Sequence, residues 1–343
     1  MRLREHPHWN PRASAFCASV GFCVSVVRSM RVLVFGAGAI GSVLGGFLAK
    51  AGHDVTLLGR AWHLDVVRNQ GLLISGLWGE HRVTALTTAT RPEDLARPRE
   101  FEWIFVCVKA HQTAEAAKTV ATLLGPRTLV CAFQNGLGNY ETLAQTIPPA
   151  RVALGRIIFG VEITPGRVRV TVCADEVLIG APDATFPSGQ VAQLVSVLQE
   201  SGIPTRATTT ILQILWAKVL YNCALNGLST LLEVPYGKLL EHPQAKGLMR
   251  DVIDEAYRVA AARKISLEPA TAEAYRERLF TRLIPDTAAH RSSMLQDVTA
   301  GKPTEIEALN GALVRLGQQA GIPVPVNTLI TRLVHAKEAF ARG

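Results

Sequence analysis

The sequence predicts an α/β domain with a parallel sheet, followed by an all-helical domain. From residue 30 to residue 204, short apolar runs alternate with helix-like stretches, which is the pattern of βαβ units. Beyond residue 204, strand-like runs nearly vanish and apolar residues recur at helical spacing, with prolines between the helical stretches. We therefore expect one domain over 30–204 and a second over 205–343, after an N-terminal extension of residues 1–29.

The elements expected in the first domain alternate along the chain. Strands are expected where short runs of β-branched and aromatic residues occur, at 31–35, 54–58, 103–108 and 128–133. Helices are expected between them, at 40–51 and 114–124. Residues 167–174 and 176–179 are expected to form a closing antiparallel pair. In the second domain, the periodicity predicts helices at 211–231, 248–263, 270–283, 305–320 and 327–341.

The composition is that of a soluble globular protein, with 48% apolar and 19% charged residues. This balance excludes a disordered chain, and no uninterrupted apolar run reaches the roughly 18 residues of a spanning helix. The formal charge of +8 is spread without the basic stripes and interleaved aromatic residues of a nucleic-acid binder. We therefore expect neither a nucleic-acid nor a membrane partner. A mild positive charge suits a small anionic ligand.

The first 29 residues contain four arginines, one acidic residue and an apolar stretch at 13–27. Three serines interrupt this stretch, and a complete strand pattern begins at Met30. These features favour a start codon assigned too far upstream over an export signal, so we expect Met30 to be the functional start. The six cysteines form no CxxC pair. Reduced thiols explain them better than a disulfide framework does, and we expect a cytoplasmic protein.

A glycine motif joins the first expected strand to the first expected helix. It consists of Gly36, Ala37, Gly38, Ala39, Ile40 and Gly41. In such a motif the first glycine allows a tight turn, the second lets the backbone approach a pyrophosphate, and the third lets helix and strand pack closely. The N–H groups at the start of the helix then bind phosphate. The motif predicts a Rossmann-type domain that binds a dinucleotide.

The end of the second expected strand indicates which dinucleotide. An NAD-preferring site has an acid there, about 20 residues after the motif, which binds the ribose 2′-hydroxyl. This chain has Gly59 and Arg60 at that point, and Asp54 lies at the opposite end of the strand. A guanidinium pairs with a 2′-phosphate, whereas a solvated surface arginine is the alternative. The missing acid favours the first reading, so we expect NADPH/NADP+ rather than NADH.

Polar residues follow two later strands of the expected sheet. Lys109 comes directly after the strand at 103–108, and Asn135 comes two residues after the strand at 128–133. Ligands bind at the carboxyl ends of parallel strands, so both side chains are expected to face the cofactor cleft. An exposed lysine and a plain Asn-Gly turn are the alternatives. Together, on neighbouring strands, the two residues favour a binding site.

A polar face on an otherwise apolar helix is the most specific signal in the sequence. Lys218, Asn222 and Asn226 stand four residues apart within the helix expected at 211–231. Each step of four residues turns by about 40°, so the three side chains share one face. Buried amides satisfied by the backbone, with an extended lysine, would explain one such residue. Three in register indicate a cleft.

The motifs occur together in one known family. The runs GAGAIG, VKAHQ, QNGLG, W-x-K-x-x-x-N-x-x-x-N, SSMLQD and TEI follow in this order, with the arginine after the second strand. By these motifs the chain resembles the ketopantoate reductases (2-dehydropantoate 2-reductases) from residue 30 to its C-terminal region. The resemblance implies a Rossmann-type domain joined to a helical domain, with the active site between them. It also implies NADPH-dependent reduction of 2-dehydropantoate to pantoate, in pantothenate and coenzyme A biosynthesis.

The resemblance also implies roles for individual residues. Lys218 would be the catalytic acid, which suits a reaction in which hydride arriving at the C2 ketone leaves an alkoxide that needs positive charge and a proton. Glu305 would touch the cofactor and would orient Lys218 or the nicotinamide ribose. The substrate would contact Lys218, Asn135, Asn222, Asn226 and Ser293. The cofactor would contact the glycine motif, Arg60, Lys109, Asn135 and Glu305. No metal is expected, because no His/Cys cluster has ligand spacing.

Two departures from the family pattern leave the substrate open. Tyr236 stands between Pro235 and Gly237 where family members often carry Asn-Gly, and the segment 156–163 lacks a threonine-rich pattern. One alternative is a reductase or dehydrogenase of the same scaffold that acts on a different 2-oxo or 3-hydroxy acid. Another is an NADPH-binding sensor without turnover, which would be expected to lose Lys218. We expect a small 2-oxo acid as substrate, and a monomer or homodimer.

Overall fold

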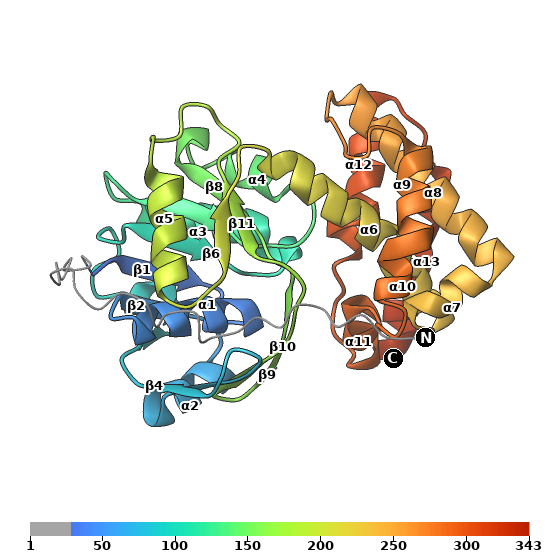
Figure 1. Cartoon of the computed structure of the whole chain (residues 1–343). Coiled ribbons are helices and arrows are strands. Elements are labelled where there is room, and N and C mark those ends of the chain that lie inside the picture. The colour runs from blue at the N-terminus through green and yellow to red at the C-terminus, as the bar shows by residue number, and fades with distance from the viewer. Residues whose placement is uncertain (1–28, 343) are drawn as a thin grey trace, which may run out of the picture.

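The computed structural model describes residues 29–342, which form an α/β domain and a helical domain. Figure 1 shows the two domains side by side, with the long helix α6 (Ile211–Leu232) running from one to the other. The predicted fold class is confirmed. The expectation for the extension at 1–29 concerns residues that, except for Ser29, lie outside the described part of the chain.

An eight-stranded sheet forms the centre of the first domain, in the order β12-β11-β8-β7-β6-β1-β2-β5. Four strands are those expected: β1 (Arg31–Phe35), β2 (Asp54–Leu58), β6 (Trp103–Val106) and β7 (Leu129–Ala132). The others are β5 (Thr87–Ala89), β8 (Val152–Arg156), β11 (Val177–Gly180) and β12 (Thr205–Ala207). The strands from β8 to β5 run parallel, and β11 and β12 run the opposite way. The last strand of this sheet, β12, thus lies just past residue 204. The predicted domain boundary between residues 204 and 205 stays a prediction.

The expected antiparallel pairing of 167–174 with 176–179 is wrong. β10 (Arg167–Cys173) pairs instead with β9 (Phe159–Thr164) and β3 (Leu72–Gly76), in a second sheet of order β4-β3-β10-β9 that also contains β4 (His81–Val83). The hairpin partner lies before β10 because Pro165 and Gly166, the latter with φ +71°, form a two-residue turn. After β10 the chain crosses to the main sheet, where Asp175 pairs with Arg156 at the end of β8.

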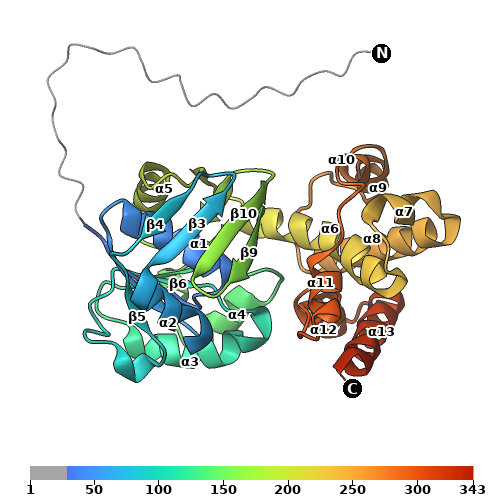
Figure 2. The ribbon, with the colours of Figure 1, turned by 90° about the horizontal axis from the view of Figure 1, so that it is seen from below.

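Helices and the second sheet cover both faces of the main sheet. α1 (Ala39–Lys50) lies between the two sheets, and Figure 2 shows the smaller sheet in front of it. Side chains of β1 alternate between two apolar cores: Val32 and Val34 pack on the α1 side, and Leu33 packs on the side of α3 (Thr113–Leu123) and α4 (Asn139–Leu143). With both faces buried, the carboxyl ends of the strands are left to receive a ligand.

α6 is the central helix of the second domain. It packs on α8 (Pro243–Ala262), α11 (Ser293–Thr299) and α13 (Pro325–Arg342). The remaining helices are α7 (Tyr236–Glu241), α9 (Ala272–Arg278), α10 (Ile284–Asp286) and α12 (Asn310–Ala320). The helix expected at 270–283 is α-helical in α9 and ends in a π-helical turn at Leu279–Leu283. No helix of residues 29–342 has both the length and the hydrophobicity that crossing a bilayer would need.

The helix expected over 305–320 begins only at Asn310, because the residues before it contact the first domain. The carbonyl of Ala308 accepts a hydrogen bond from the N–H of Leu137 at 3.0 Å. Gly136 permits this approach, since a Cβ there would lie 2.4 Å from the Cβ of Ala308. The turn Ile306–Ala308 therefore sits on the loop after β7, which brings Glu305 next to Asn135.

Candidate active site

The glycine motif connects β1 to α1 as predicted. A Cβ at Gly36, where φ is +108°, would lie 2.7 Å from the amide nitrogen of Val108, and a Cβ at Gly41 would lie 2.3 Å from the carbonyl oxygen of Gly36. A Cβ at Gly38 would meet nothing within 4 Å, and no side chain caps the start of α1. Gly36 and Gly41 thus permit close packing, whereas Gly38 borders open space in front of the free N–H groups at the start of α1. This arrangement fits a dinucleotide pyrophosphate.

The open space at Gly38 makes a prediction. Gly38→Ala is expected to raise the dissociation constant of NADPH at least about tenfold, because the new methyl group occupies space that the pyrophosphate needs. The melting temperature should stay unchanged, since the methyl group meets no protein atom. Titration of protein fluorescence with NADPH measures the effect. Gly247→Ala is the matched control, because it also adds a methyl group in open space. Unchanged NADPH affinity in Gly38→Ala would contradict the assignment.

Arg60 lies beside the glycine motif, at the residue before α2 (Ala61–Gln70). The N–H groups of Gly36 and Ala37 both donate to the carbonyl of Leu58, which holds the end of β2 against the motif. The side chain of Arg60 is exposed, and its guanidinium stands 5.6 Å from the ring centroid of Trp62. A cation in this place fits a 2′-phosphate on the ribose next to the pyrophosphate.

Lys218 reaches from α6 to the first domain. Its Nζ donates to the Oδ1 of Asn135 and to the carbonyl oxygen of Ile157, each at 2.6 Å. An ammonium group has three N–H bonds. The third has no acceptor among the described residues, so it is available to a ligand.

Asn135 joins Lys218 to Glu305. While its Oδ1 accepts from Lys218, its Nδ2 donates to the Oε2 of Glu305 at 3.1 Å. Both ends of the amide are therefore engaged, which fixes its orientation. The Nζ of Lys109 lies 3.7 Å from the same Oε2 and 3.3 Å from the Oδ2 of Asp297. Two loops of the first domain and three segments of the second, which carry Lys218, Asp297 and Glu305, thus meet in one polar network.

Burial sets the acidity of the network. The pKa of Lys218 is lowered to about 8, mainly because the ammonium is enclosed; Glu305 opposes this shift, and the nearby Arg156 guanidinium adds to it. Burial also raises the pKa of Asp297, against the effect of Lys109. A lysine with a pKa of about 8 is still protonated at pH 7 by about ten to one, and it gives up its proton far more readily than an exposed lysine does.

The remaining predicted substrate residues line the same helix face or lie near it. Asn222 forms no hydrogen bond with any described residue, whereas the Oδ1 of Asn226 accepts from the hydroxyl of Tyr236 at 2.6 Å. Ser293 opens α11 with an exposed side chain, and its neighbour Ser292 caps the helix by accepting from the N–H of Leu295. The hydroxyl of Ser293 has no partner in residues 29–342.

The structure thus joins some predicted residues directly and leaves others apart. Lys218, Asn135, Glu305 and Lys109 form one network, but within residues 29–342 the glycine motif and Arg60 share no hydrogen bond or ion pair with it. Sequence reasoning gave no role to Asp297, although it stands four residues after Ser293 and therefore on the same face of α11. It also missed the carbonyl of Ile157, because a backbone acceptor leaves no trace in the residue type.

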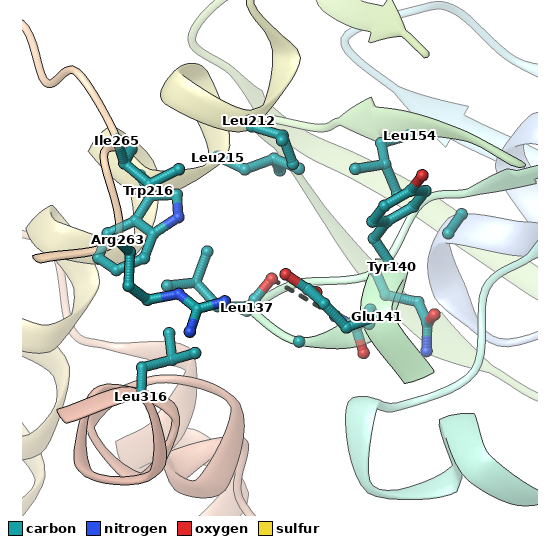
Figure 3. Close-up of a pocket in the computed structure, with 15 residues that line it drawn as sticks. Leu137, Tyr140, Glu141, Leu154, Leu212, Leu215, Trp216, Arg263, Ile265 and Leu316 are labelled. Carbon is teal, nitrogen blue, oxygen red and sulfur yellow. Dashed lines mark hydrogen bonds between the residues drawn. The ribbon is translucent and has the colours of Figure 1, made fainter. Parts of the chain in front are cut away.

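A cavity of about 200 Å³ also lies between the domains, and Figure 3 shows the side chains that line it. Mostly apolar side chains line it, among them Leu212, Leu215 and Trp216 of α6, and Arg263 and Glu141 extend toward it from opposite domains. None of the predicted catalytic or substrate residues lines this cavity. It adjoins the polar network around Lys218, because Gln134 and Gly136, on either side of Asn135, line it. Among the described residues, no group of three or more His, Cys, Asp and Glu side chains is placed to hold a metal ion.

Comparisons with known proteins give the family. The family model described as ketopantoate reductase PanE/ApbA matches residues 32–184, and the model of its C-terminal part matches residues 210–338. A 2-dehydropantoate 2-reductase of Aquifex aeolicus is 41% identical over 312 residues, which cover 91% of this chain and 98% of the relative. The chain belongs to the ketopantoate reductase family. Its members are NADPH-dependent oxidoreductases, so this chain is an oxidoreductase of that type.

Other relatives match over similar lengths. A 2-dehydropantoate 2-reductase of Halobacterium salinarum is 34% identical, over 89% of this chain and 98% of its own length. The crystal structure of a PanE/ApbA family ketopantoate reductase from Ralstonia eutropha matches with a TM-score of 0.81 and 31% identity, over 92% of this chain and all of that one. A D-mandelate dehydrogenase in complex with NADH and anilino(oxo)acetate matches with a TM-score of 0.79 and 27% identity, over the same shares.

Proposed function

We propose that this ketopantoate reductase family member reduces 2-dehydropantoate to pantoate with NADPH, and that Lys218 gives the proton. The observation that carries the proposal is the Lys218 ammonium, buried between Asn135 and Ile157 with one N–H bond free and a pKa of about 8. The glycine motif, Arg60, Lys109, Asn135 and Glu305 would hold the cofactor. When bound, NADPH supplies the hydride.

In this proposal Lys218 has two tasks. Its positive charge stabilises the negative charge that develops on the C2 oxygen, and its free N–H bond delivers the proton to that oxygen. Asn135 aims the ammonium, because its amide is fixed between Lys218 and Glu305. Glu305 helps to keep Lys218 protonated, because it raises the pKa of Lys218 against the effect of burial. Asn135 thereby serves both the cofactor and the substrate side of the site.

The substrate carboxylate is assigned to Ser293. Its hydroxyl stands free in the first turn of α11, where N–H groups at the helix start favour an anion. The terminal amides of Asn222 and Asn226, four and eight residues beyond Lys218, suit the neutral oxygens of the acid.

Ser293→Ala is expected to raise KM for the 2-oxo acid about tenfold while kcat changes less than twofold, because a carboxylate loses one donor worth about 1–3 kcal/mol. Steady-state kinetics at saturating NADPH measures both constants. Ser292→Ala is the matched control: it removes the helix cap, so it should lower the melting temperature without a specific change in KM. Equal KM values for wild type and Ser293→Ala would place the carboxylate elsewhere.

An assay of NADPH oxidation against a panel of 2-oxo acids tests the function itself. We expect 2-dehydropantoate to give the highest kcat/KM. The D-mandelate dehydrogenase relative favours including an aromatic 2-oxo acid, phenylglyoxylate, because it shares this fold and was solved with an anilino 2-oxo acid. A higher kcat/KM for phenylglyoxylate than for 2-dehydropantoate would support the proposed reaction but assign it a different substrate. No turnover of any acid, with NADPH bound, would support a sensor.

A further inference from the structure

Tyr236 is buried at the start of α7, and its hydroxyl contacts the last residue of the polar face of α6. Only 2% of Tyr236 is exposed, and its hydroxyl lies 2.6 Å from the Oδ1 of Asn226, which is itself 5% exposed. The two residues stand ten positions apart, so the bond ties α7 to α6. Like most buried polar groups, this hydroxyl has a hydrogen-bond partner, and that partner is a residue assigned to the substrate.

The hydrogen bond selects one orientation of the Asn226 amide. The hydroxyl has no other acceptor among the described residues, so turning the amide over would leave the buried O–H without a partner, at a substantial cost. Burial raises the pKa of Tyr236, so the hydroxyl stays protonated and remains a donor at any working pH. With Oδ1 turned toward Tyr236, the end of the Asn226 amide that is left for a ligand carries its two N–H bonds.

The Nδ2 of Asn226 has no acceptor in residues 29–342, and neither has the amide of Asn222 one turn before it. Around Tyr236 the wall is aromatic: the ring centroid of Tyr221 lies 6.0 Å away and that of His290 lies 5.1 Å away. One side of this region thus provides N–H donors, and the other presents aromatic rings. Such a site favours a substrate end that pairs methyl groups with a hydrogen-bond acceptor.

We propose that Tyr236 is a positioning residue that locks the amide of Asn226 with its N–H bonds toward the substrate, and thereby makes the enzyme select 2-oxo acids with a hydroxyl at the end remote from the ketone. The inference rests on the proposed function. It assigns the selectivity for the substrate to Tyr236, which stands where family members often carry the Asn of Asn-Gly. This departure had left the substrate open in the sequence analysis. A site built to bond a hydroxyl rejects the analogue that lacks it, because its own donor is then left unpaired.

Tyr236→Phe removes only the hydroxyl, so it tests the lock. We compare kcat/KM for 2-dehydropantoate with that for trimethylpyruvate, which has the same skeleton without the hydroxyl. In the variant, kcat/KM for the hydroxylated acid is expected to fall about tenfold, mainly through KM, and that for trimethylpyruvate to change less than twofold. In an Asn226→Ala background the same substitution should cause no further loss of selectivity, because the amide it positions is gone.

The control is Tyr275→Phe, another buried tyrosine of the second domain, whose hydroxyl has no hydrogen-bond partner among the described residues. It should leave the selectivity unchanged. If Tyr236→Phe lowers kcat/KM equally for both acids together with the melting temperature, Tyr236 is structural and the inference is overturned. Unchanged selectivity overturns it as well, while the proposed function stands. Failure of the wild type to reduce either acid overturns the proposed function, and the inference with it.

Discussion

Replacing Lys218 by alanine is expected to lower kcat by about 10²–10⁴-fold, the usual cost of removing a general acid. The dissociation constant of NADPH should change little, because the cofactor residues, except Glu305, lie in the first domain. Steady-state kinetics and fluorescence titration measure the two effects separately. Lys238→Ala is the matched control, since Lys238 is an exposed lysine of the same domain that pairs only with Glu241. Near-normal kcat in Lys218→Ala would make Lys109 the first candidate for the acid.

The pH profile gives the same residue a second signature. Burial lowers the pKa of Lys218 from that of an exposed lysine to about 8. Reduction requires the protonated form, so kcat/KM should be level below this pKa and fall tenfold per pH unit above it. Glu305→Gln removes the neighbour that raises the pKa, so the fall should begin at lower pH. A profile that is level to pH 10 would exclude Lys218 as the acid.

Replacing Arg60 by alanine is expected to weaken NADPH binding about ten- to a hundredfold, since charge-assisted contacts to a phosphate are worth about 1.5–3 kcal/mol. NADH lacks the 2′-phosphate, so its affinity should stay the same and the preference should disappear. Fluorescence titration with both cofactors measures this. Arg68→Ala is the control, because Arg68 lies in the helix that follows Arg60 and pairs with Asp65. Equal binding of the two cofactors by the wild type would contradict the assignment of Arg60.

Much of this molecule follows from local patterns. The glycine motif, the four parallel strands and the polar face of α6 were all predicted, because turn chemistry and periodicity are written in neighbouring residues. The partner of β10 was mispredicted, since it depends on which of two turns closes the hairpin, and Pro165–Gly166 was overlooked. The helix at 305–320 was predicted too long because Ala308 bonds to Leu137, a contact 171 residues away in the chain.

In the candidate site, too, single residues could be predicted from local patterns, whereas contacts between distant segments could not. Lys218 and Asn135 were singled out separately, by helix spacing and by position after a strand. The bond between them, like that from Asn135 to Glu305, joins segments 83 and 170 residues apart and could not be read from either segment. Asp297 was within reach, because it stands one helical turn after Ser293. The carbonyl of Ile157 was not, since every residue carries one.

The contact of Gly136 with Ala308 limits how the two domains can be exchanged between relatives. Since a Cβ at Gly136 would lie 2.4 Å from that of Ala308, any side chain at position 136 must displace Ala308 and would withdraw Glu305 from Asn135. A chimaera that joins another member's first domain to this second domain would therefore keep its network only if a glycine arrives at position 136. In recombination, positions 136 and 308 would have to be exchanged together, although they lie 172 residues apart in the chain.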